Sequence, residues 1–95
     1  MTDDPWKKKI YRAKHSAYGK LKAAGYRVIF LPADPLFDIE ASRSSELRKV
    51  RVMLTTPTHH EISALRNIKF PPSCKKEIWV RVATAREFAI VDIDA

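Results

Sequence analysis

A short apolar segment near the middle of the chain carries two carboxylates, and a charged segment follows it. Residues 36–40 have the sequence LFDIE, and after a polar turn come residues 48–55, RKVRVMLT. A carboxylate in an apolar strand beside a second charged strand is typical of sites that hold a divalent cation, because Mg²⁺ prefers oxygen ligands. The second segment offers other side chains where a further carboxylate and a lysine would be needed: Lys49, Arg51 and Met53. The pattern therefore predicts a cation site that lacks part of its ligand set.

The length and composition indicate one small domain. Ninety-five residues with 45% apolar content suit a single folded unit over residues 1–95. No apolar run approaches the roughly 20 residues that cross a bilayer, and the first residues lack the layout of a signal peptide. Cys74 stands alone and forms no disulfide within the chain. We expect a cytoplasmic protein with no membrane partner.

The positive charge is concentrated at the N-terminus. The chain has a formal net charge of +7. Residues 1–31 hold eight Lys and Arg against two Asp, whereas residues 77–95 hold two Arg against four acidic side chains. Such a field favours a polyanionic partner, and we expect DNA. The alternative is a solvated, lysine-rich helix that only aids solubility.

Two helices follow from the spacing of apolar residues. The first is expected over 5–24, with Pro5 at its start and Gly25 as its left-handed stop. Residues 58–61 have the form of a capping box and begin the second helix, which ends before residues 71–72, both proline. The stripe of the first helix that should face the core consists of Trp6, Ile10, Ala13, Ala17, Leu21 and Ala24.

Five apolar, β-branched or aromatic runs predict strands. Their ranges are 26–31, 36–41, 48–54, 77–82 and 87–93, and a tight turn joins the last two. The order is helix, three strands, helix, two strands. We expect an α/β domain with a central mixed sheet flanked by two helices.

This order of elements resembles the PD-(D/E)XK, or restriction-endonuclease-like, superfamily, and within it the Holliday-junction-resolvase type of archaea and phages. The resemblance extends from Trp6 to Ile93. It depends on four segments: GYRV at 25–28, PLFDI at 35–39, VMLT at 52–55 and EIWV at 77–80. It implies an αβββαββ fold, a homodimer, and Mg²⁺-dependent cleavage of DNA.

The catalytic positions of that superfamily are only partly matched here. Asp38 matches the metal-binding aspartate, whereas Arg51 stands at the next carboxylate position and Met53 at the catalytic lysine position. No residue from 5 to 24 is acidic, so the glutamate of the first helix has no counterpart. A guanidinium about 4 Å from a divalent cation is repelled by several kcal/mol. We therefore expect Arg51 to form an ion pair with Asp38 in place of a metal.

Three functions remain open. The leading hypothesis is a DNA-binding protein of nuclease-like fold, with branched or junction DNA as its partner, a degenerate active site and no cofactor. Its phosphate contacts would come from Lys7, Lys8, Lys9, Arg12, Lys14 and Lys22, with Arg48, Lys49 and Arg51 around the degenerate site. The first alternative is an active Mg²⁺-dependent endodeoxyribonuclease in which Asp38 and Glu40 are catalytic and Asp38 binds the metal. The second is an interaction module or homodimeric partner subunit that uses the degenerate face or the strand ending at Ile93.

Three further groups of residues could take part in chemistry. Tyr11 and Tyr18 lie seven residues apart among lysines, which suits base stacking, although packing at the margin of the core is the commoner role. His59 and His60 diverge by about 100° on a helix and would chelate one ion poorly, so we expect a surface role. Cys74 is expected to be an ordinary loop thiol.

Overall fold

The computed structural model describes residues 5–70, 73–81 and 87–94. Along the chain the elements are α1 (Pro5–Ala23), β1 (Arg27–Phe30), β2 (Ile39–Arg43), β3 (Glu46–Met53), α2 (His59–Arg66), β4 (Cys74–Val80) and β5 (Ala89–Asp92). The predicted order of elements and the predicted α/β class are confirmed.

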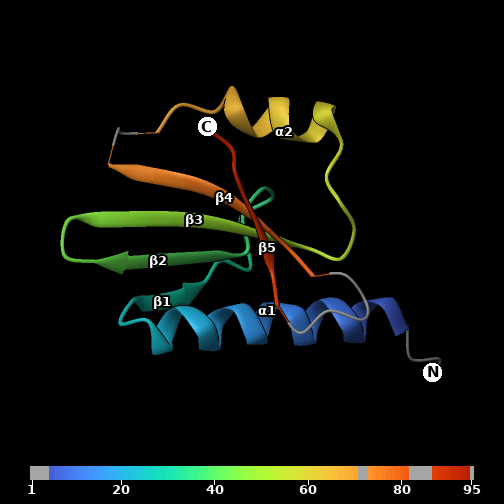
Figure 1. The fold of residues 1–95 in the computed structure, drawn as a ribbon, viewed down its shortest axis with the longest axis horizontal. Coiled ribbons are helices and arrows are strands. Elements are labelled where there is room, and N and C mark those ends of the chain that lie inside the picture. The colour runs from blue at the N-terminus through green and yellow to red at the C-terminus, as the bar shows by residue number, and fades with distance from the viewer. Residues whose placement is uncertain (1–4, 71–72, 82–86, 95) are drawn as a thin grey trace.

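The strands form one mixed sheet whose spatial order follows the sequence, β1-β2-β3-β4-β5 (Figure 1). The first three strands are an antiparallel meander. β3 and β4 are parallel, with α2 in the connection between them, and β5 returns antiparallel to β4. In Figure 1, α1 lies on one side of the sheet and α2 on the other. Within the described residues, no helix is long and apolar enough to span a membrane.

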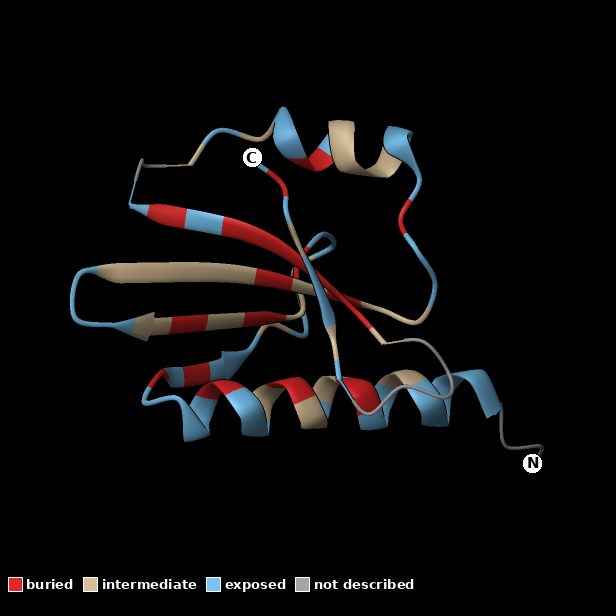
Figure 2. Cartoon of the chain, in the orientation of Figure 1, coloured by how far each residue is buried: buried red, intermediate tan, exposed pale blue. Residues whose placement is uncertain are grey.

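The two sides of the sheet have separate hydrophobic cores. The larger core packs the inner stripe of α1 against the sheet and consists of Ala13, Ala17, Leu21, Tyr26, Val28, Ile39, Ala41, Val50, Val52 and Trp79. The smaller core lies under α2 and consists of Phe37, Leu65, Ile78, Val80 and Ile93. Figure 2 shows the buried residues of α1 on the side that faces the strands. Alternate residues of β3 and β4 serve the two cores, as the twofold period of a strand requires.

Two expected members of the α1 stripe are exposed. Trp6 is 55% exposed and Ala24 is exposed as well. Trp6 belongs to the first turn of α1, and this end of the helix extends beyond the strands (Figure 1). Ala24 follows the end of the helix, where Gly25 has a φ of 92° and provides the predicted left-handed stop.

All five strands begin at residues other than those predicted, and β1 and β5 begin one and two residues later, at Arg27 and Ala89. β2 begins at Ile39 rather than 36, because the Asp34 carboxylate accepts the N–H groups of Leu36 and Phe37 at 2.8 and 3.0 Å and holds a turn there. β2 and β3 then extend to a turn of only two residues, in which Ser44 has a φ of 53°. β4 begins at Cys74 rather than Glu77.

Cys74 is therefore a buried strand residue, and the expectation of a loop thiol was wrong. Burial raises the pKa of this thiol, because the charged thiolate loses its hydration. A buried thiol with a raised pKa is a poor nucleophile.

The second helix has the predicted start but an earlier end. The Thr58 oxygen accepts the Glu61 N–H at 3.1 Å, and the Glu61 carboxylate accepts the Thr58 N–H at 3.1 Å. α2 ends at Arg66, where buried Lys76 donates to the carbonyl groups of the final turn and the residues after it, Leu65, Arg66 and Ile68. The two prolines expected to end the helix, at 71–72, and the turn at 82–86 expected to join the last two strands lie outside the described residues.

Candidate functional site

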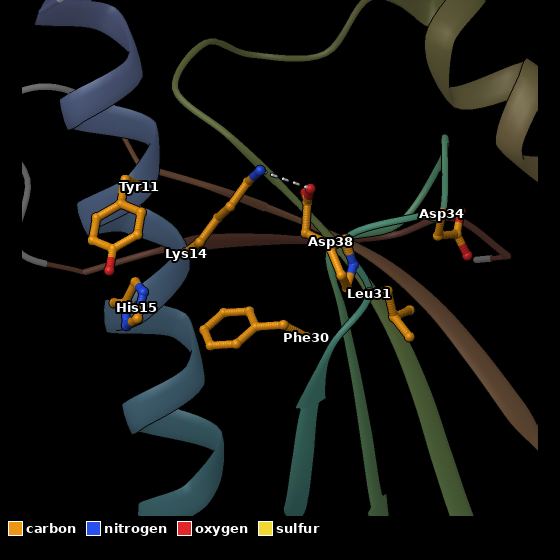
Figure 3. A pocket seen from close by; sticks show the side chains of 8 residues that line it. Tyr11, Lys14, His15, Phe30, Leu31, Asp34 and Asp38 are labelled. Atoms are coloured by element: carbon orange, nitrogen blue, oxygen red, sulfur yellow. Dashed lines mark ion pairs between the residues drawn. The ribbon is translucent and has the colours of Figure 1, made fainter. Parts of the chain in front are cut away.

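Asp38 immediately precedes β2 and is fixed by the backbone on both sides. Its N–H donates to the Val50 carbonyl at 2.9 Å, and its own carbonyl accepts the Leu31 N–H at 2.9 Å. One carboxylate oxygen, Oδ2, accepts the Val52 N–H at 2.7 Å. The other, Oδ1, lies 3.2 Å from the Lys14 Nζ of α1 (Figure 3). The carboxylate thus extends the β2–β3 ladder by one bond and also binds a cation.

The prediction that Arg51 forms an ion pair with Asp38 was wrong, because each of the two residues has a different partner. Arg51 Nη1 donates to the Leu36 carbonyl at 3.1 Å, and the cation beside Asp38 is Lys14. Lys14 follows the buried Ala13 on α1, so its side chain leaves the helix at the margin of the packed face and reaches the end of the sheet. This contact joins residues 24 positions apart, and no local sequence pattern encodes it.

Glu40 does not join Asp38 in a shared site. It lies opposite Lys49 on the neighbouring strand, and their charged atoms are 3.0 Å apart. Lys49 is paired in register with Lys76, which lies under α2, whereas Asp38 contacts α1. The two carboxylates of the alternative catalytic pair therefore serve different cations.

The donors around Asp38 do not fit a magnesium site. Mg²⁺ needs several oxygen ligands, yet Asp38 already holds an ammonium group and an amide, and Glu40 is neutralised by Lys49. Among the residues that the structure describes, no group of three or more His, Cys, Asp or Glu could hold a metal ion. A divalent cation at Asp38 would lie beside the Lys14 ammonium, and the two positive charges repel each other.

An open pocket of about 350 Å³ lies beside this ion pair. It is lined by Tyr11, Lys14, His15, Phe30, Leu31, Pro32, Asp34 and Asp38. Figure 3 shows the rings of Tyr11, His15 and Phe30 on one side of the ion pair, with Asp34 turned away from Asp38. The turn amides of Leu36 and Phe37 lower the pKa of Asp34, so this carboxylate stays charged and bound to its own loop.

The rings near the pocket form a continuous row, here called the aromatic row: Tyr11, His15, Phe30 and Tyr18. Successive ring centroids are 4.2, 4.9 and 4.8 Å apart, and Tyr18 stacks on Phe30. Tyr18 has the packing role expected of it, whereas Tyr11 is 62% exposed. The sequence patterns did not single out His15 or Phe30. The i, i+4, i+7 spacing of the three helical rings was a usable signal for His15, but nothing local connects Phe30 to them.

The nine expected phosphate-contact residues fall into two groups. Five are exposed along α1: Lys7, Lys8, Lys9, Arg12 and Lys22. The other four are half-buried and bind protein groups. Lys14 binds Asp38 and Lys49 binds Glu40, whereas Arg48 binds Glu46 and Glu77, and Arg51 binds the Leu36 carbonyl. The structure therefore brings Lys14 to the Asp38 site and does not gather Arg48 or Lys49 there.

Comparison with known proteins identifies the fold. No protein-family model matches the chain, and no curated protein matches it. Among solved structures, the chain is similar to Hjc, a Holliday junction resolvase from the archaeal hyperthermophile Archaeoglobus fulgidus. The TM-score is 0.69 with 16% identity, and the match covers 90% of this chain and 73% of that one. At this identity the similarity shows the fold alone, which is the nuclease-like fold of the resolvase.

Proposed function

We propose that the protein binds DNA, branched DNA in particular, and does not cleave it with a divalent metal. The observation that carries this proposal is the Lys14–Asp38 ion pair, 3.2 Å between Nζ and Oδ1, in a chain with the fold of a Holliday junction resolvase. The carboxylate that matches the metal-binding aspartate of such nucleases binds a lysine instead. No second carboxylate adjoins this pair among the described residues, since Glu40 binds Lys49, so a divalent cation lacks oxygen ligands there, whereas the ammonium attracts a phosphate.

The basic face of α1 supplies the contact with the DNA backbone. Lys7, Lys9, Arg12 and Lys22 are exposed, and α1 has no acidic residue in its first turn. Each phosphate neutralised by such a side chain releases condensed counterions, with a slope of about −0.9 in log affinity against log salt. Four such contacts predict a slope of roughly −3.6 on this rule.

A homodimer is the assembly we propose for this activity. The edge strand β5 exposes Ile90 by 51%, and its described residues pair only with β4 on one side. An exposed apolar edge strand favours pairing with another chain. Size-exclusion chromatography with light scattering tests this part separately, since Ile90→Lys should produce a monomer if the edge strand is the interface.

The function is tested by a gel-shift panel of duplex, single-stranded and four-way-junction DNA, with and without Mg²⁺, scored for both retardation and cutting. We expect retardation of the junction at the lowest protein concentration, weakening as salt rises from 50 to 200 mM, and no nicks. A variant in which Lys7, Lys9 and Arg12 are all replaced by alanine should bind about tenfold more weakly or worse. Lys69→Ala is the matched control, because Lys69 is also exposed but follows α2 on the other side of the sheet.

Three results would overturn the proposal. Affinity that does not change with salt, or that does not fall in the triple variant, excludes binding through α1. Mg²⁺-dependent nicking that disappears in Asp38→Ala would instead support the alternative of an active endonuclease.

A further inference from the structure

The pocket beside the Lys14–Asp38 pair exposes aromatic rings, with the His15 ring tilted by 44° against Tyr11 and by 49° against Phe30. Tyr11 and His15 lie one turn apart on α1, and Phe30 ends β1. Tyr11 is 62% exposed and Phe30 37%, and the His15 ring lies between them, with centroids 4.2 and 4.9 Å away. Exposed rings held at such distances offer a preformed surface on which another planar group can stack.

The same pocket is also lined by polar groups, Lys14 and Asp38 among them. The Lys14 ammonium has three N–H donors and the Asp38 carboxylate about four lone-pair sites, which their mutual contact and the Val52 N–H only partly use. Their side chains are 36% and 23% exposed. The pair therefore presents both a donor and an acceptor to a molecule that enters beside the rings (Figure 3).

Exposed cations lie at both ends of the aromatic row. Lys7 precedes Tyr11 by four residues, and Lys22 follows Tyr18 by four, with its Nζ 5.9 Å from the Tyr18 ring centroid. Positive charge on both sides of a row of rings is the arrangement of single-strand binding grooves, in which cations follow the phosphates and rings receive the bases. This charge complementarity favours a nucleic acid over an apolar peptide as occupant.

We propose that this pocket receives one unpaired nucleobase of the bound DNA; the inference rests on the proposed DNA-binding function. The base stacks on the exposed Tyr11 ring, beside His15 and Phe30, while its Watson–Crick edge meets Lys14 and Asp38. Every base exposes both a donor and an acceptor on that edge, but in a duplex the partner strand occupies it. The pocket thus selects unpaired nucleotides, such as those at a branch point, without selecting their sequence.

The test uses duplex DNA with 2-aminopurine either in a one-base bulge or paired at the same position. Stacking quenches this fluorophore, so binding should quench the bulged probe and leave the paired probe nearly unchanged. Tyr11→Ala should raise the Kd for the bulged probe about tenfold, equivalent to about 1.4 kcal/mol, within the range measured for base–aromatic stacking. It should raise the Kd for the paired probe less than twofold.

Two variants show whether a loss of affinity in Tyr11→Ala comes from the lost ring stacking in the pocket. Tyr11→Phe keeps the ring and should retain affinity for the bulged probe within twofold. If the Tyr11 hydroxyl rather than the ring made the contact, this variant would lose affinity as Tyr11→Ala does. Trp6→Ala removes another exposed ring from α1 that does not line the pocket, and should change neither probe selectively.

The outcomes separate this inference from the proposed function. Binding to both probes without selective quenching, or an equal loss for both in Tyr11→Ala, overturns the base pocket and leaves DNA binding by α1 intact. A change of oligomeric state in Tyr11→Ala shows that the pocket holds a second copy of the chain and also overturns it. Failure of the wild-type protein to bind any DNA refutes both.

Discussion

Two clusters of carboxylates and cations lie at opposite ends of β2 and β3 and use the same kinds of residue differently. The first, here called the closed cluster, begins beside the β2–β3 turn and continues onto β4, and consists of Tyr26, Glu46, Arg48, Glu77 and Trp79. Arg48 lies 3.0 Å from a Glu46 oxygen and 3.2 Å from a Glu77 oxygen. The Tyr26 hydroxyl donates to Glu46 at 2.7 Å, and the Trp79 Nε1–H donates to Glu77 at 3.3 Å.

The Lys14–Asp38 pair at the other end is open. One lysine meets one carboxylate, both partly exposed, and aromatic rings with a pocket adjoin them. A cluster whose polar groups are all satisfied stabilises the fold, and breaking it leaves a buried charge unpaired. A partly exposed pair contributes little to stability and keeps its groups available. The comparison teaches that access to solvent and ligand, rather than residue type, separates the structural cluster from the candidate site.

The largest expected effect comes from breaking the closed cluster. Glu77→Ala removes one partner of Arg48 and the acceptor of Trp79 Nε1, so the free energy of unfolding should fall by about 3 kcal/mol. Urea denaturation measures this loss, and Glu77→Gln, which keeps an acceptor for Trp79, should lose less. A loss below about 1 kcal/mol would mean that the cluster is no more structural than a surface pair.

Asp38 should contribute less to the free energy of unfolding than Glu77, and its contribution should come from the hydrogen bond with the Val52 N–H. Asp38→Ala leaves the Val52 N–H without its carboxylate acceptor, at a cost of about 2 kcal/mol in the free energy of unfolding. Asp38→Asn retains an oxygen acceptor and should keep most of the stability, although it also removes the charge beside Lys14. If both variants are equally unstable, the ion pair rather than the Val52 bond holds this end of the sheet.

A charge reversal at Lys14 should convert the open pair into a metal site. Lys14→Glu places a second carboxylate beside Asp38, so Mn²⁺ at ten times its Kd should raise the free energy of unfolding by about 1.4 kcal/mol. Lys20→Glu makes the same charge change at an exposed position of α1 and serves as the control. If Mn²⁺ stabilises the wild-type protein as much as Lys14→Glu, the proposal that Lys14 keeps a divalent cation away from Asp38 is wrong.

The smallest expected effect is the part of the pH dependence of stability that comes from Glu46 in the closed cluster. Hydrogen bonds from Tyr26 and Arg48 lower the pKa of Glu46 to about 2 from an ordinary value of 4.5. Between these values the unfolded chain binds more protons than the folded one, so the contribution of Glu46 is complete above pH 4.5 and is lost as the pH falls through 2. Unfolding free energies measured across this window should flatten in Glu46→Gln, whereas an unchanged slope would assign the acid sensitivity to other groups.

Much of the fold could be predicted because it is encoded by local periodicity. The spacing of three and four places Ala13, Ala17 and Leu21 on one buried stripe, and the capping box at Thr58 lies where its pattern predicts. The bounds of the elements were predicted less well, because they depend on groups distant in sequence or on side chains that compete for the backbone. The Asp34 carboxylate delays β2, and the Lys76 ammonium ends α2 early.

The sequence by itself determined the order of the elements, the basic first helix, and the shortage of carboxylates around Asp38. Only the tertiary structure decided which cation meets Asp38, and it is Lys14 rather than Arg51. It also brought Phe30 against His15 to complete the aromatic row. The physical reason is that periodicity specifies which face of an element is buried, whereas the partner of a charged or aromatic side chain depends on how two elements distant in sequence pack against each other.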